Sequence, residues 1–173
     1  HNFPKLGDFN WHFVSWRFRF YDNQLNERVR YARHALAIDE HRKDFDRVPW
    51  ASKGARQPRT NEPEWLRQVW FAGNHSDIGG SYPEDEARLS DISLDWMLQE
   101  AIELPHPLQV DRTKLHLFPD ACGPQHCELE SIRDAYPTWW PTKWRLVWAT
   151  QTRNILPEAP LHPSVIARFG FPP

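Results

Sequence analysis

The feature that most constrains the fold is a short apolar run that ends in a glycine-rich turn and is followed by a helix. Residues 68–71 are too short for a helix and rich in β-branched and aromatic side chains, which predicts a buried strand. Three of the seven glycines follow, at positions 73, 79 and 80. A helix is predicted from Ser90, whose hydroxyl can cap it, to about Pro105. This order of strand, turn and helix is typical of a layered α/β domain.

Two further elements are predicted before that strand. Residues 12–20 alternate apolar and polar side chains, which predicts a strand with one buried face. Residues 25–37 carry apolar side chains at helical spacing, with Asn26 available as a cap, which predicts a helix. Residues 51–63 have almost no large apolar side chains and are predicted to form a loop.

Prolines recur beyond residue 104, and only weak strand candidates occur there, at residues 114–118 and 145–150. We therefore expect residues 1–104 to form the α/β layer and residues 105–173 to form an aromatic, proline-rich extension packed on the same domain. The tryptophans of residues 139–148 favour a core role, with an apolar or carbohydrate-facing surface as the alternative.

Composition excludes some functions and leaves others open. The formal net charge of −2 gives no reason to expect nucleic acid as a partner. No run of 18 apolar residues occurs, so we expect no transmembrane segment and, by default, a soluble cytoplasmic protein. The chain starts at His1 and its only methionine is Met97, so we expect residues upstream of His1 in the natural protein.

A metal site is not predicted. Cys122 and Cys127 lie near His116 and His126, but their spacing differs from that of a zinc knuckle, and no second cysteine pair exists. We expect no metal and no cofactor.

The turn after residue 71 is the candidate site. From local chemistry alone, a functional loop around His75 and a tight surface turn remain equally open. Asp77 is expected to orient His75 or, preferably, to cap the turn through its own side chain. Asn74 is expected either to bind substrate or to tolerate a left-handed backbone. The candidates for contact with substrate are Asn74, Ser76, Gly79 and Gly80.

Two blocks carry a family resemblance: YARHALAIDEHR at residues 31–42 and VWFAGNHSDIGGSYP at residues 69–83. In this order they resemble an α/β-hydrolase family, formerly of unknown function, that includes lipase and phospholipase effectors of the bacterial type VI secretion system. The similarity continues through residues 89–98 and 161–165. It implies that this chain is the C-terminal part of an α/β-hydrolase-like layered sheet. It also implies a Ser, Asp and His triad in which His75 is the general base.

The chain departs from the family pattern at the nucleophile and at the acid. No Gly-x-Ser-x-Gly occurs; Ser81 comes nearest, but Pro83 replaces the second glycine. We therefore expect the nucleophile upstream of His1, in a missing N-terminal half of the same domain. The family's Trp-Asp-Thr context for the acid is also absent. Asp39 is the best local substitute, unless it is a helix-end charge or a partner for Arg42.

The resulting hypothesis is part of a serine esterase or phospholipase-like hydrolase that acts on a lipid or small acyl ester. The resemblance is also compatible with delivery as a secreted effector. The alternative is a non-catalytic fragment or a lipid- or protein-binding module. A metal-assisted hydrolase that uses His75 and Asp77 is a weaker third hypothesis, because two ligands do not make a site.

Overall fold

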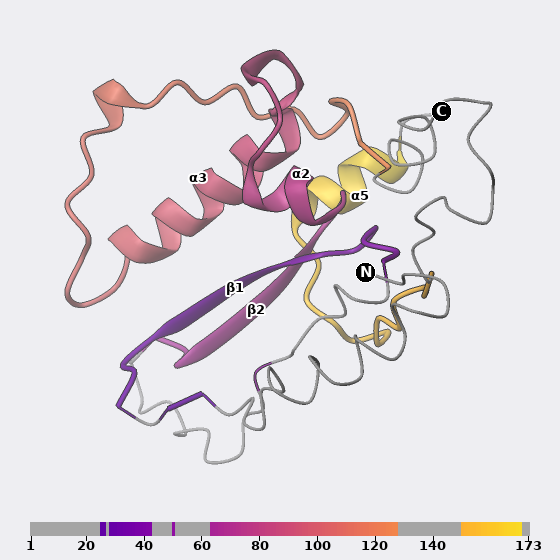
Figure 1. Ribbon diagram of the computed structural model, residues 1–173. Coiled ribbons are helices and arrows are strands. Elements are labelled where there is room, and N and C mark those ends of the chain that lie inside the picture. Colours follow the sequence, from indigo (N-terminus) through magenta and orange to yellow (C-terminus); the bar gives the residue numbers. More distant parts are fainter. Residues whose placement is uncertain (1–24, 27, 43–49, 51–62, 128–149, 171–173) are drawn as a thin grey trace, which may run out of the picture.

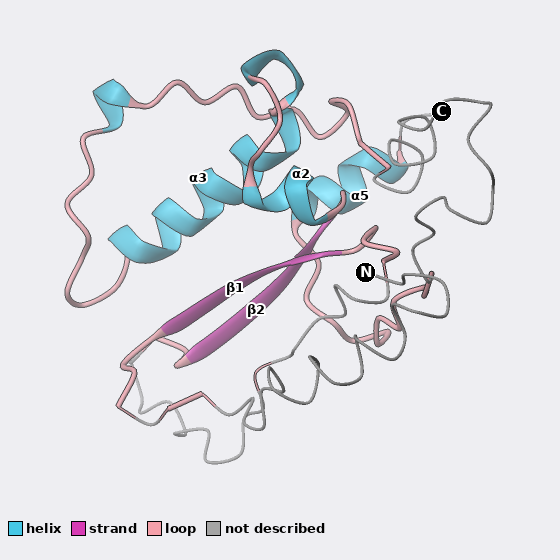
Figure 2. Ribbon diagram, viewed as in Figure 1, coloured by secondary structure: helices cyan, strands magenta, loops and turns pink. Residues whose placement is uncertain are grey.

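The computed structural model describes residues 25, 26, 28–42, 50, 63–127 and 150–170 of the chain. These residues form a small mixed α/β unit in which helices lie beside a two-stranded parallel sheet (Figure 1). Figure 2 distinguishes these elements from the long connections between them. Among the described residues, no helix has the length and apolar character needed to cross a bilayer.

The sheet consists of β1, Ala32–Ala37, and β2, Leu66–Phe71, paired in parallel from Ala32 opposite Leu66 to Ala37 opposite Phe71. The strand predicted at residues 68–71 is therefore confirmed. The helix predicted over residues 25–37 is wrong, because residues 32–37 are strand and Asn26 caps only a turn, through a 2.9 Å bond from the Arg28 N–H. A parallel strand is covered on both faces, so its apolar residues need not alternate and can imitate helical spacing.

Helix α3, Arg88–Ile102, confirms the predicted helix, although it begins two residues before Ser90. The Ser90 hydroxyl donates to the Ala87 carbonyl instead of capping the first turn. Leu89 and Ile92 of this helix form the hydrophobic core with Val69 and Phe71 of β2. Burial of these four side chains holds α3 against one face of the sheet.

The C-terminal part of the described chain also packs on the sheet. The Trp70 N–H donates to the Pro160 carbonyl at 2.9 Å, and the His162 N–H donates to the Trp70 carbonyl at 2.8 Å. Helix α5, Pro163–Phe169, follows directly and buries Val165. The short helix α2, His75–Gly79, follows β2 in the chain and precedes α3 (Figure 1).

The strand predicted at residues 114–118 is wrong. Arg112–Lys114 forms a short 3-10 turn, η3, because the Asp111 carboxylate accepts bonds from the Thr113 N–H and hydroxyl. Of the strand predicted at residues 145–150, only Thr150 is described, and it forms a bridge with Arg42. The remaining predictions lie outside the described residues: the strand at residues 12–20, the loop at residues 51–62 and the tryptophan cluster at residues 139–148.

A buried carboxylate joins α3 to both strands. Glu100 is 7% exposed, and its Oε2 lies 2.5 Å from Arg33 Nε of β1. Its Oε1 pairs with Arg67 of β2. The two positive charges offset the cost of burying one negative charge far from water.

Replacing Glu100 by Ala should lower the free energy of unfolding by about 3 to 5 kcal/mol, because Arg33 would be left buried without its carboxylate. Urea unfolding measures this change. Glu103→Ala, at an exposed position just after the same helix, is the matched control and should change the value by less than about 0.5 kcal/mol. Equal effects of the two substitutions would contradict this account.

The turn between β2 and α2 depends on a glycine. Gly73 has φ of 119°, a region that other residues rarely adopt. A Cβ at this position would lie 2.6 Å from the Asp77 Cβ, which is closer than two carbons can approach. The turn therefore excludes any side chain at position 73.

Gly73→Ala should lower the free energy of unfolding by about 1 to 3 kcal/mol, through backbone strain and the contact with Asp77. Gly79→Ala is the control, since a Cβ there meets no atom within 4 Å. Position 79 is also the last residue of α2, where alanine favours the helix more than glycine does. This substitution should leave stability unchanged or raise it by up to about 1 kcal/mol. The urea midpoints of both variants test the account, which fails if Gly73→Ala is tolerated as well as Gly79→Ala.

Candidate functional site

The candidate site begins at the N-terminus of α2, where β2 ends. Asn74 is the N-cap, and its Oδ1 accepts hydrogen bonds from the Ser76 and Asp77 N–H groups, both at 2.8 Å. Asp77 Oδ2 accepts the Asn74 N–H at 2.9 Å in return. This reciprocal capping box satisfies N–H groups that a helix start otherwise leaves without partners. Asp77 thus makes the local backbone bond expected of a turn residue.

Asn74 does not have the left-handed backbone that was one of its two expected roles, because its φ is −82°. The left-handed positions are the glycines on either side of the turn, Gly73 and Gly80. The Asn74 amide also points inward, and its Nδ2 donates to the Tyr82 hydroxyl at 3.0 Å and to the His126 carbonyl at 3.1 Å. Both ends of this side chain therefore bind other parts of the protein.

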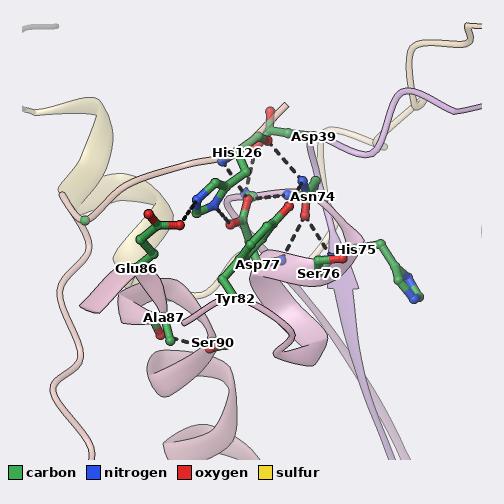
Figure 3. A network of polar contacts seen from close by, with 12 residues as sticks. Asp39, Asn74, His75, Ser76, Asp77, Tyr82, Glu86, Ala87, Ser90 and His126 are labelled. Atoms are coloured by element: carbon green, nitrogen blue, oxygen red, sulfur yellow. Dashed lines mark hydrogen bonds and ion pairs between the residues drawn. The ribbon is translucent and has the colours of Figure 1, made fainter. Parts of the chain in front are cut away.

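Asp77 is the centre of a larger polar network (Figure 3). It is 1% exposed, and its Oδ1 lies 2.8 Å from His126 Nδ1, while its Oδ2 accepts the His126 N–H at 3.2 Å. His126 Nε2 lies 3.0 Å from Glu86 Oε2. The imidazole stacks on the Tyr82 ring with 3.6 Å between centroids. Sequence reasoning considered His126 only as a metal ligand and did not find this network.

Two acidic residues that follow β1 hold the same turn from the other side. Asp39 Oδ2 accepts the Gly73 N–H at 2.7 Å, and the Asp39 N–H donates to the Gly73 carbonyl at 3.0 Å. Glu40 is 2% exposed, and its Oε2 accepts the His75 N–H at 3.3 Å. The backbone of residues 73–75 is therefore bound directly to the end of β1.

Glu40, rather than Asp39, is the partner of Arg42, with contacts of 2.8 Å and 2.7 Å between the guanidinium and the carboxylate. Burial opposes the charge of Glu40. The hydrogen bonds and charge of Arg42, together with the bond from the His75 N–H, outweigh burial and lower the pKa of this carboxyl. Sequence reasoning missed Glu40, although its position directly after Asp39 and two residues before Arg42 was the available indication.

His75 is exposed, and Figure 3 shows its imidazole directed away from Asp39 and Asp77. The structure brings the backbone of His75 to the acidic residues but does not bring its imidazole to them. Gly79 and Gly80 are exposed in the same short helix and its cap, and Ser76 is half-buried. His75 and the two glycines thus face solvent beyond the carboxyl ends of two parallel strands, where open α/β sheets bind their ligands.

His34 lies in β1, not in a helix, and belongs to a separate contact. Its Nδ1 donates to Gln68 Oε1 at 3.1 Å, and its ring stacks on Trp50 with 4.7 Å between centroids. Burial lowers the pKa of His34, with the bond to Gln68 opposing and the charge of Arg153 adding to the effect. Among the described residues, no group of three His, Cys, Asp or Glu side chains is arranged to hold a metal ion.

Comparisons with known proteins bear on this site. Uncharacterized protein YEL023C of Saccharomyces cerevisiae is 42% identical over 53 residues, which are 29% of this chain and only 8% of the yeast protein. The chain thus covers a small part of that curated relative. No solved structure matches the chain.

Residues 4–100 match the family described as the Tle1-like phospholipase effectors of the type VI secretion system (T6SS), in its catalytic domain. The match covers more than half of the chain and includes both strands, the turn with His75 and most of α3. The chain therefore belongs to the family of Tle1-like phospholipase effectors.

Proposed function

We propose that this chain is the histidine-bearing part of a serine hydrolase that cleaves acyl esters of phospholipids or related lipids. The observation that carries the proposal is the placement of His75: exposed, at the carboxyl end of a parallel strand, on a turn fixed from both sides. The family supports a lipid substrate. The fold proposed for the whole domain is a layered α/β-hydrolase sheet, of which β1 and β2 form the C-terminal strands.

In this mechanism the imidazole of His75 accepts the proton of a serine hydroxyl as that oxygen attacks the ester carbonyl. It then returns the proton to the departing alcohol. The serine and the donors for the oxyanion lie on a segment upstream of His1, because no Gly-x-Ser-x-Gly occurs in this chain. Gly79 and Gly80, which carry no side chains, let the substrate approach the turn closely.

Asp39 and Asp77 serve this mechanism through the backbone. Each carboxylate binds N–H groups of the turn, and the His75 imidazole points away from both. We therefore assign them to positioning the turn. Asn74 and Ser76 have the same role through the capping box. The acid that orients the imidazole then comes from outside these contacts, with the nucleophile.

We further propose that residues 1–104 and the extension at 105–173 form one body. The supporting contacts are the two backbone bonds that join β2 to residues 160 and 162.

The alternative function is a non-catalytic fragment or a lipid- or protein-binding module. Only the absence of a Gly-x-Ser-x-Gly sequence from this chain favours it. Labelling with a fluorophosphonate, which reacts with activated serines, separates the two: the complete protein should be labelled and the 173-residue chain should not. Labelling of this chain alone would place the nucleophile within it, against the proposal.

His75→Ala in the complete protein should lower kcat/KM for acyl-ester hydrolysis on the order of 10² to 10⁴-fold, because the serine proton loses its acceptor. Release of fatty acid from phospholipid vesicles measures this loss. His116→Ala, an exposed histidine outside the turn, is the control and should leave the rate unchanged. An unchanged rate for His75→Ala would falsify the assignment.

A further inference from the structure

His126 has a carboxylate at each of its two ring nitrogens (Figure 3). Asp77 Oδ1 of α2 lies 2.8 Å from Nδ1, and Glu86 Oε2 of η2, the 3-10 turn Glu84–Glu86, lies 3.0 Å from Nε2. A neutral imidazole has one N–H, whereas an imidazolium has two. Ionised carboxylates only accept hydrogen bonds, so both contacts are favourable at once only when His126 is protonated.

Burial of Asp77 strengthens this argument. Its carboxylate is 1% exposed, and its ion-pair partner among the described residues is His126. A buried negative charge is costly unless a positive charge or several donors compensate it. Loss of the proton from His126 would remove the positive charge and leave an imidazole lone pair facing a carboxylate oxygen.

The contact also joins distant parts of the chain. Residues 120–127 reach the turn through the His126 N–H, which donates to Asp77, and the His126 carbonyl, which accepts from Asn74. The same segment lies against α3, since a Cβ on Gly123 would be 2.4 Å from the Arg88 Cβ. Arg168 of α5 donates to the carbonyl oxygens of two residues in it, Ala121 and Gly123.

We propose that protonated His126 is a latch that fastens residues 120–127 to the turn carrying His75, and that loss of this proton loosens the segment. The latch stands independently of the hydrolase assignment. Only its consequence for catalysis rests on the proposed function. The turn that carries His75 should be better ordered at pH values below the titration midpoint of His126 than at values above it.

The charged and titratable groups around the imidazole favour the protonated form. Asp77 comes from α2, Glu86 from η2, and the Tyr82 ring lies against one face. Two cations of the packed helices interact elsewhere: Arg88 pairs with Glu84, and Arg168 binds backbone carbonyls. Burial opposes the charge on His126, but the hydrogen bonds and charges of Asp77 and Glu86 outweigh it and raise its pKa above 6.5.

The sign of the pH dependence follows. Because the pKa is higher in the folded than in the unfolded chain, the stabilisation is fully present below pH 6.5 and is lost as the pH rises through the folded value. Each unit by which the folded pKa exceeds 6.5 corresponds to as much as a tenfold change in the ratio of fastened to released segment.

The first test is an NMR titration of the His126 ring in the 173-residue chain. The midpoint should lie above 6.5 and should fall in Glu86→Gln, which removes the charge of a half-exposed partner without touching buried Asp77. Asp85→Asn, an exposed acid in the same 3-10 turn, is the matched control and should leave the midpoint unchanged. A wild-type midpoint at or below 6.5, or equal midpoints in the two variants, would overturn the proposal.

The second test is hydrogen exchange of the His126 and Ile78 amides, corrected for the intrinsic effect of pH. The first donates to Asp77 and the second to the Asn74 carbonyl. The protection of both should fall as the pH rises through the measured midpoint, and in Glu86→Gln the fall should occur at lower pH. Protection that stays constant through the midpoint shows that protonation does not fasten the segment, and the latch is then rejected.

Discussion

The buried carboxylate of Asp77 is the group on which the described site depends. It accepts the Asn74 N–H that starts α2, and it binds both the backbone and the ring of His126, 49 residues further along the chain. A charged carboxylate loses most of its hydration when it is 1% exposed, so each of these donors is needed. The requirement to satisfy one buried charge therefore fixes the start of a helix and the course of a distant segment together.

The sheet register supplies the second constraint. Ala37 lies opposite Phe71, and the same offset of 34 residues places Asp39 opposite Gly73. One backbone–carboxylate bond and one backbone–backbone bond form between these two residues. Glu40 is then opposite the N-cap and reaches the next N–H, that of His75. A slip of one residue would move both carboxylates out of register with these N–H groups. Pairing of β1 with β2 thus determines which groups meet the turn, and the packing of α3 on β2 keeps the pair in place.

Local pattern was enough to predict β2, α3 and the turn between them, because composition, glycine position and spacing agree there. It failed at β1, where burial on both faces removes the alternation that identifies a strand. It also failed to find Glu40 and His126, whose partners are 35 and 49 residues away. No local periodicity encodes such contacts, since they arise only when the parallel pairing and the chain beyond α3 bring the segments together. The histidine turn was the strongest indication in the sequence, but its local pattern did not reveal which distant groups hold it.

The arrangement separates two tasks that the sequence left open for the same side chains. Asp39 and Asp77 were considered as partners for the imidazole of His75, but both bind backbone N–H groups of the turn, and the imidazole points outward. A base that must meet a serine and an acid gains from a rigid backbone, because errors in the position of the reacting atoms are costly. The two carboxylates supply that rigidity, while the imidazole of His75 itself is exposed. If His75 is the general base that we propose, the turn is a preformed support for it, and the serine and the acid of the reaction come from outside these contacts.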